Sequence, residues 1–212
     1  MIDNESTTRF WDKLAPSYAK KPIPDEAIYQ RKINLTQQHL SAYDEIFEFG
    51  CGTGGTAILH APKVKHIVAT DVSPAMIEIA KQQAIEAGVK NASFLVGQIE
   101  ELQHPDKRYD AVLGLNIMHL IETTEATLNQ VHQMLKTGGI FVSSTPLLKN
   151  EPVIIRWIIR IMQAIGRAPY IKFLDKDGFM KQVNDAGFEI IHEWSPTKSS
   201  IFLIARKNMP TI

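Results

Sequence analysis

Cysteine is almost missing from this 212-residue sequence, since Cys51 is the only one. An intrachain disulfide and a metal site built from several cysteines are therefore excluded. Neither sign of charge is in excess, with 23 basic and 23 acidic residues, so no overall electrostatic reason exists to expect a nucleic-acid partner. The seven histidines lack metal-ligand spacing such as H-x-x-x-H. We expect neither a bound metal nor a nucleic acid.

Long apolar runs and a secretory signal are also missing. No uninterrupted apolar run reaches the roughly 20 residues that span a bilayer, and "MIDNESTTRF" lacks the basic-then-apolar order of a signal peptide. These absences predict a soluble, cytoplasmic protein. No internal repeat or low-complexity segment is present, and a chain of this length fits one domain that buries about 70% of its unfolded surface.

What the sequence does contain is an alternation of short β-branched runs with helical stretches, which predicts a parallel sheet covered on both faces. Ser73 and Pro74 suit the start of one helix and Gly88 its end. Only "SPTK" separates the apolar runs 187–194 and 199–207, which predicts an antiparallel hairpin on the sheet edge. The other strands are predicted at 45–49, 66–71, 92–97, 109–116 and 139–145, with helices at about 54–61, 73–87 and 123–136.

The stretch "FEFGCGTGGT" places glycines between the first of these strands and the first helix, the context of nucleotide-binding loops. Gly50, Gly52 and Gly55 fit G-x-G-x-x-G, while Gly50, Gly52 and Gly54 fit G-x-G-x-G. Asp71 ends the next strand about 20 residues on, where a carboxylate can accept both ribose hydroxyls. A turn without a ligand and a simple helix cap are the alternatives. Loop and acid together predict an adenosine-containing ligand, either NAD or S-adenosylmethionine.

Three features favour S-adenosylmethionine. Glu48 precedes the loop and completes E-x-G-x-G-x-G, a helical segment precedes the first strand, and a hairpin replaces a second nucleotide-binding half. The sequence resembles class I S-adenosylmethionine-dependent methyltransferases of the small-molecule type, a group that includes ubiquinone-pathway enzymes. Residues 41–145 carry the resemblance in the motifs "FEFGCGTGGT", "ATDVSPAMIEIAK", "VGQIEEL", "YDAVLGLNIMHLI" and "MLKTGGIFVSST".

The resemblance implies an α/β, Rossmann-like, doubly wound fold. It has a mostly parallel seven-stranded sheet, an antiparallel C-terminal hairpin strand, a helical N-terminal cap and a lid insertion. We expect a single methyltransferase domain over residues 1–212, divided into the cap (1–40), the cofactor-binding core (41–145), the lid insertion (146–175) and a C-terminal helix with the hairpin (176–212).

The resemblance also implies the cofactor contacts. A backbone carbonyl near Asn116 and Ile117 would meet the methionine amino group, and Ile99 would press on the adenine ring. Gln98 departs from the acidic residue frequent in the family, although its carbonyl can still accept a hydrogen bond from the adenine amino group. The expected cofactor-binding residues are Glu48, Gly50, Cys51, Gly52, Gly54, Asp71, Val72, Met76, Gln98, Ile99, Asn116 and Ile117.

Methyl transfer from a sulfonium mainly needs alignment, and a base only when the nucleophile arrives protonated. His119 is a candidate base or a histidine satisfied within a helix start. Tyr18 is a candidate cation–π cover for the sulfonium, or cap packing. Thr145, followed by Pro146, would line the same cleft. The expected catalytic residues are therefore His119 and Tyr18, and the expected substrate-binding residues are Trp11, Tyr18, Thr145, Arg156 and Arg160.

The segment 151–174 is almost wholly apolar apart from its arginines. Arg156 and Arg160 share a helix face, which Arg167 would extend. The segment is either a lid helix buried against the cap, or an apolar substrate wall with peripheral membrane contact. We expect a small, apolar or amphiphilic acceptor, such as a quinone precursor, a lipid or a hydrophobic thiol. An NAD-dependent oxidoreductase and a non-catalytic S-adenosylmethionine-binding module are the alternatives.

Overall fold

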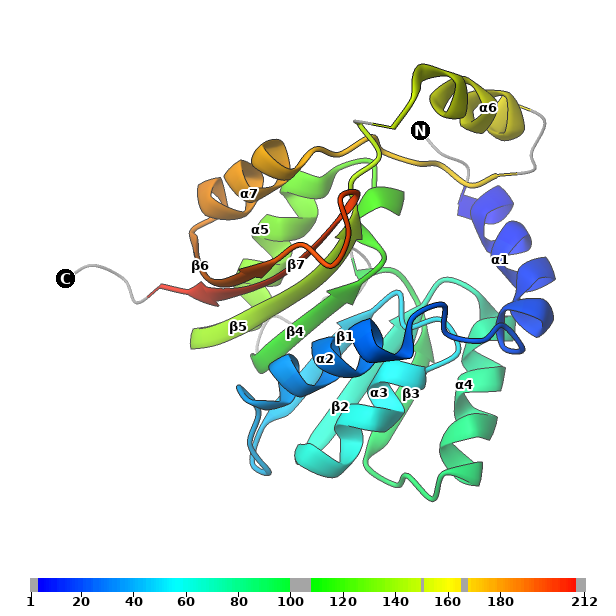
Figure 1. Ribbon diagram of the computed structural model, residues 1–212. Coiled ribbons are helices and arrows are strands. Elements are labelled where there is room, and N and C mark those ends of the chain that lie inside the picture. Colours follow the sequence, from blue (N-terminus) through cyan, green and yellow to red (C-terminus); the bar gives the residue numbers. More distant parts are fainter. Residues whose placement is uncertain (1–3, 100–107, 150, 165–167, 209–212) are drawn as a thin grey trace.

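Seven strands form one mixed sheet in the order β3-β2-β1-β4-β5-β7-β6 (Figure 1). This computed structural model describes residues 4–99, 108–149, 151–164 and 168–208. The pairs β1–β2, β2–β3, β1–β4 and β4–β5 are parallel, and β7 is antiparallel to both β5 and β6. The strands are β1 (Glu45–Phe49), β2 (His66–Asp71), β3 (Ala92–Val96), β4 (Tyr109–Leu115), β5 (Leu135–Pro146), β6 (Phe188–Trp194) and β7 (Ser200–Lys207).

Helices cover both faces of this sheet, so the predicted doubly wound fold is confirmed. On one face α5 and α7 pack on alternate strand residues such as Phe47 and Phe141; on the other, α3 and α4 pack on residues such as Ile46 and Val142. The helices are α1 (Asn4–Tyr18), α2 (Glu26–Gln37), α3 (Gly55–His60), α4 (Pro74–Glu86), α5 (Thr124–Met134), α6 (Val153–Ala164) and α7 (Lys176–Asp185), with 3-10 turns η1 (Ala61–Lys63) and η3 (Met118–Leu120).

The element boundaries differ from the prediction mainly at β5. This strand begins at Leu135 rather than at residue 139, and α5 ends at Met134, because Leu135 is buried and pairs with Tyr109. The predicted hairpin forms, with β6 at the edge and β7 between β6 and β5. Ser73 caps α4 as predicted, since its Oγ accepts the Met76 amide hydrogen at 3.1 Å.

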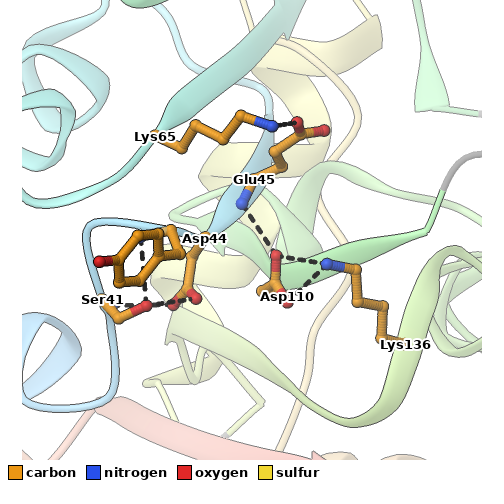
Figure 2. Close-up of polar contacts among 7 residues, drawn as sticks. Ser41, Asp44, Glu45, Lys65, Asp110 and Lys136 are labelled. Atoms are coloured by element: carbon orange, nitrogen blue, oxygen red, sulfur yellow. Dashed lines mark hydrogen bonds and ion pairs between the residues drawn. The ribbon is translucent and has the colours of Figure 1, made fainter.

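Charged side chains tie together the amino-terminal ends of β1 and β4 (Figure 2). The Glu45 amide donates to Asp110 Oδ2 at 2.8 Å, and Lys136 Nζ lies 2.8 Å from both carboxylate oxygens of Asp110. Lys65 Nζ lies 2.7 Å from Glu45 Oε1. The opposite, carboxyl-terminal edge of the parallel strands is therefore the edge left for loops that bind ligands.

The helix α6 stands away from the sheet, beyond one end of α1 (Figure 1). Most of its apolar side chains are exposed, including Ile154 and Trp157 at 67% and 58%. The expectation of a lid helix buried against the cap is therefore wrong, because the apolar surface of α6 is not covered by the described part of the chain. Within that part, no helix is long and apolar enough to cross a membrane.

Candidate functional site

The glycine loop after β1 has a backbone that only the G-x-G-x-G pattern explains. Gly50, Gly52 and Gly54 all have positive φ, at 65°, 53° and 79°, whereas Gly55 begins α3. A Cβ on Gly50 would lie 2.6 Å from Cγ1 of Ile117, which follows β4. A Cβ on Gly55 would meet only the Tyr29 hydroxyl, at an ordinary 3.7 Å. The overlapping G-x-G-x-x-G match is therefore incidental at its last position.

Glu48 lies buried beneath this loop. Its Oε1 accepts a hydrogen bond from Thr56 Oγ1 at 2.8 Å, while its Oε2 has no partner among the described residues. Burial, opposed by the Thr56 hydrogen bond and reinforced by the Asp71 charge, raises the pKa of Glu48 to about 7. A buried carboxylate oxygen without a partner is costly, so a cationic or donor ligand group here would lower that cost.

Asp71 ties the glycine loop to the start of α4. Its Oδ2 accepts the Gly52 amide hydrogen and its Oδ1 the Ser73 amide hydrogen, each at 2.9 Å. Burial raises the pKa of Asp71 against these bonds, helped by the Asp12 charge. Because a carboxylate offers about four acceptor positions, Asp71 keeps acceptor capacity for a ribose hydroxyl. Capping and ligand binding are therefore compatible roles for Asp71.

Three residues that the sequence did not point to connect the N-terminal helices to the core around the loop. Asp12 Oδ1, from α1, accepts from Ser73 Oγ at 2.6 Å and from the Ala75 amide at 3.1 Å. Tyr29, from α2, has its pKa raised to about 12 by burial and then by Glu48. Lys32 Nζ, also from α2, donates to Ser144 Oγ at 2.8 Å.

Tyr18 lies against the glycine loop. A Cβ built on Gly52 would meet its Cε1 at 3.7 Å, and burial followed by the Asp71 charge raises its pKa. Trp11, the other aromatic predicted on this helix, is half-buried and packs edge-on against Phe10 with ring centroids 5.2 Å apart. Tyr18 therefore lies beside the loop, whereas the contact given for Trp11 is with Phe10.

A hollow of about 400 Å³ opens between α1 and the carboxyl ends of β2 and β3. Val72 and Gln98, two of the expected cofactor-binding residues, line it. Ile99 instead joins the buried core, and its carbonyl accepts a hydrogen bond from Gln130 Nε2. Two other expected contacts, Cys51 and Met76, are also buried. The rest of the "VGQIEEL" motif lies outside the described residues.

Asn116, after β4, is the one described non-glycine residue with positive φ, at 56°. Asparagine tolerates this conformation better than most residues, and such outliers concentrate at functional sites. Its backbone N–H donates to the Ser144 carbonyl at 2.6 Å, and its side-chain Oδ1 accepts from Ser144 Oγ at 3.4 Å. Lys32, Ser144 and Asn116 thus form a polar row across the ends of β4 and β5. Burial lowers the pKa of Lys32.

His119 lies in η3, directly beyond this row. Burial lowers its pKa to about 4, and its Nδ1 has no partner among the described residues. Its imidazole is therefore neutral near pH 7, which suits a weak base as well as a packed histidine. Thr145 is fully buried, with its Oγ1 3.1 Å from Ser143 Oγ. The Thr145 side chain thus faces the interior.

The two predicted arginines on α6 lie in different settings. The Arg156 guanidinium lies over the Phe173 ring at 5.5 Å and donates to the Lys149 carbonyl at 3.4 Å, while Arg160 is exposed. Arg167 lies outside the described residues. Among the described residues, no three His, Cys, Asp or Glu side chains gather closely enough to hold a metal ion.

The charges around the loop favour a cation over a pyrophosphate. In addition to burial, the Asp71 charge raises the pKa of Glu48, and the Asp12 charge raises the pKa of Asp71. Burial, Glu48 and Asp71 raise the pKa of Cys51. Such acidic surroundings disfavour the two negative charges of a dinucleotide and stabilise a positively charged ligand. Together with the unpartnered Glu48 oxygen, they fit an adenosine-containing ligand that carries positive charge.

Comparison with known proteins agrees with this geometry. Residues 46–139 match the family described as "Methyltransferase domain". The ubiquinone biosynthesis O-methyltransferase of Rickettsia canadensis is 32% identical over 69% of this chain and 63% of its own length. The chain spans about half the length of other curated relatives, 45% and 55% in two cases.

Two solved structures share the fold. The [4+2]-cyclase SpnF has a TM-score of 0.79 at 17% identity, covering 96% of this chain and 95% of that one. A complex of DhpI with SAH has a TM-score of 0.74 at 16% identity, covering 97% of each chain.

Proposed function

Because the chain belongs to the class I S-adenosylmethionine-dependent methyltransferases, we propose that it binds S-adenosylmethionine at the glycine loop and methylates a small, apolar or amphiphilic molecule. The observation that carries the proposal is the buried Glu48 carboxylate, whose Oε2 has no described partner beneath three left-handed glycines. S-adenosylmethionine bears a sulfonium and an ammonium group, so it suits these acidic surroundings. The structure solved with SAH on the same fold supports the choice of cofactor.

We assign the following roles to the residues of the loop. The left-handed glycines let the backbone approach the ligand without a Cβ in the way. Asp71, held by the Gly52 and Ser73 amides, presents its remaining acceptor positions to the ribose. Val72 and Gln98 bind the adenine side from the hollow that they line. When bound, S-adenosylmethionine supplies a methyl group already activated by positive sulfur.

The N-terminal helices and the ends of β4 and β5 would align the acceptor. Tyr18, with Trp11 further along α1, would cover the reacting centre from the cap side. Thr145, with its side chain turned inward, would contribute only through its backbone. His119 would take a proton where the acceptor arrives protonated, and its lowered pKa makes it a weak base that stays neutral near pH 7.

The proposed acceptor class follows from the candidate cations and from the aromatic residues of the N-terminal cap. Arg156 and Arg160, as the sequence suggested, or Lys32, found in the structure, would attract a carboxylate or phosphate on the acceptor. The aromatic side chains Trp11 and Tyr18 of the N-terminal cap would contact its apolar part. A quinone precursor agrees with the name of the Rickettsia canadensis relative, and a lipid or a hydrophobic thiol has the same chemistry. We expect the reaction to take place in the cytoplasm.

Two other functions stay open to test. An NAD-dependent oxidoreductase would need the loop to accept a pyrophosphate beside Glu48 and Asp71. A module that binds the cofactor without transferring methyl is favoured by one observation, that the structural neighbour SpnF is named a cyclase. Fold alone therefore does not settle the reaction.

Calorimetric titration tests the cofactor. We expect S-adenosylmethionine and S-adenosylhomocysteine to bind and NADH not to bind, because carboxylates surround the loop. Asp71→Asn should weaken binding by about 1–3 kcal/mol, since the charged acceptor for ribose hydroxyls is lost. Asp71→Ala should cost more, because the Gly52 and Ser73 amides also lose their acceptor. Tight NADH binding without S-adenosylmethionine binding would restore the oxidoreductase.

Transfer of a labelled methyl group tests the reaction. The protein is incubated with methyl-labelled S-adenosylmethionine and a cell extract, which is then separated into lipid, small-molecule and macromolecular pools. We expect label in the lipid or small-molecule pool, because the proposed acceptor is a small, apolar or amphiphilic molecule and the chain has no excess positive charge. Binding of the cofactor with no label in any pool would favour the non-catalytic module.

The acceptor identified in this way also separates the candidate cations. Lys32→Met and the double variant Arg156→Gln/Arg160→Gln are compared for KM of the acceptor and for cofactor affinity. A rise of about tenfold in KM at unchanged cofactor affinity assigns the anion contact to the substituted side chain. Wild-type kinetics in the arginine variant would remove both arginines from acceptor binding.

A further inference from the structure

The helix α6 turns its apolar side away from the protein. Ile154, Trp157, Ile158 and Ile161 recur at helical spacing and so share one face. These four side chains are 67%, 58%, 49% and 57% exposed. Elsewhere in the fold such a stripe would be buried against the sheet, as in α5 and α4. On α6 the described residues leave it uncovered.

The opposite side of α6 holds the helix in place. Arg156 lies over the ring of Phe173 at 5.5 Å and donates to the Lys149 carbonyl at 3.4 Å. Gln163 Nε2 donates to the Pro169 carbonyl at 2.9 Å. The polar side thus attaches α6 to the segments that lead into and out of it. This attachment fixes the apolar face outward, where Figure 1 shows α6 projecting beyond the sheet.

The charges in and around α6 indicate which partner its apolar face would bind. From Pro152 to Leu174 the sequence contains three arginines and one lysine and no acidic residue. Arg160 is exposed and three positions from Trp157, so it lies beside the apolar stripe. An exposed apolar stripe with a tryptophan and flanking cations matches helices that lie in the interface of anionic membranes. With 12 residues, α6 is about 18 Å long, too short to span a bilayer.

We propose that α6 docks this protein on an anionic phospholipid surface, with the stripe of Ile154, Trp157, Ile158 and Ile161 inserted at the level of the head groups. Arg160 contacts the lipid phosphates. The docking is a separate function from methyl transfer. It would hold the cleft beside a surface that dissolves amphiphilic molecules. A second copy of this chain covering the stripe is the competing outcome.

Vesicle flotation with the full chain tests the docking. Vesicles consist of phosphatidylcholine with or without phosphatidylglycerol. We expect binding to the vesicles that contain phosphatidylglycerol, and at least about tenfold weaker binding for Ile158→Gln/Ile161→Gln, since two inserted side chains become polar. Arg160→Gln should weaken binding to these anionic vesicles about fivefold. The control is Ile85→Gln, because Ile85 on α4 is also an exposed isoleucine, at 71%, and its substitution should leave vesicle binding unchanged.

Three results would overturn the docking. The wild-type chain could fail to float with anionic vesicles, Ile85→Gln could weaken binding as much as the α6 variant, or sedimentation velocity could show a dimer that the α6 variant abolishes. Circular dichroism confirms that each variant is folded, which is expected because the substituted side chains are exposed. A parallel titration with S-adenosylmethionine reports on the proposed function independently, so the two proposals can fail separately.

Discussion

Gly50→Ala should abolish cofactor binding and destabilise the protein more than Gly52→Ala, whose added Cβ would meet only Tyr18 Cε1 at 3.7 Å. Gly50 has a φ of 65°, which costs an alanine about 1–2 kcal/mol. The added Cβ would also lie 2.6 Å from Ile117 Cγ1, and such overpacking costs about 1–3 kcal/mol more. Urea denaturation measures the stability, and calorimetric titration with S-adenosylmethionine measures the binding.

Two other glycines provide matched controls. Gly88 has a φ of 68° but no atom within 4 Å of its added Cβ, so Gly88→Ala isolates the cost of the backbone conformation, about 1–2 kcal/mol. Gly55 lies at the start of α3 without positive φ, so Gly55→Ala should be neutral or stabilise by up to about 1 kcal/mol. If Gly55→Ala were as damaging as Gly50→Ala, the G-x-G-x-x-G pattern would be the functional one.

The sequence predicted the sheet well because its signals are local. Each of the strands β1 and β2 is an apolar run bounded by polar or glycine residues, and both were predicted with the bounds that the structure shows. β5 was predicted too short because "LKTGG" looks like a turn. In the structure Gly138, with a φ of 78°, accommodates the irregular pairing near Tyr109, so the strand extends back to Leu135.

The site was only partly predictable, because half of it comes from distant segments. The glycine loop and Asp71 belong to contiguous motifs, whereas Lys32 reaches Ser144 across 112 residues. Nothing in the sequence around Lys32 or Tyr29 distinguishes them from ordinary residues of an exposed helix. The direction of the apolar face of α6 was likewise not predictable from the sequence, because an apolar stripe at helical spacing normally indicates burial. Only the packing in the structure shows that this face points outward.

Glu48→Gln should raise the stability of the ligand-free protein at pH 8 by up to roughly 3 kcal/mol. The ordinary pKa of a glutamate side chain is 4.5, and burial raises the pKa of Glu48 in the folded protein to about 7. Between these values the folded chain keeps a proton that the unfolded chain has lost, so the free energy of unfolding falls as pH rises from 4.5 to 7 and stays low above. Glutamine does not ionise and still offers Thr56 an acceptor, so this decrease disappears.

Urea denaturation at pH 4.5 and pH 8 measures the effect. The gain from Glu48→Gln should be near zero at pH 4.5 and largest at pH 8, because only there is the wild-type carboxyl ionised in both states. Glu189→Gln is the control, since Glu189 is an exposed glutamate and its replacement should change the free energy of unfolding by no more than about 0.5 kcal/mol. An equal gain at both pH values would mean that Glu48 is not held protonated by its burial.

The same carboxyl should couple proton release to cofactor binding. A cation bound beside Glu48 stabilises its ionised form, so below its pKa of about 7 binding of S-adenosylmethionine should expel up to one proton from the wild-type protein. Titrations at pH 6 in two buffers of different ionisation enthalpy measure that number directly, without any methyl transfer. Glu48→Gln should release none and bind more weakly at pH 8, where the wild type supplies the negative charge. Equal proton release in both proteins would place the cation away from Glu48 and leave the unpartnered oxygen without a role in binding.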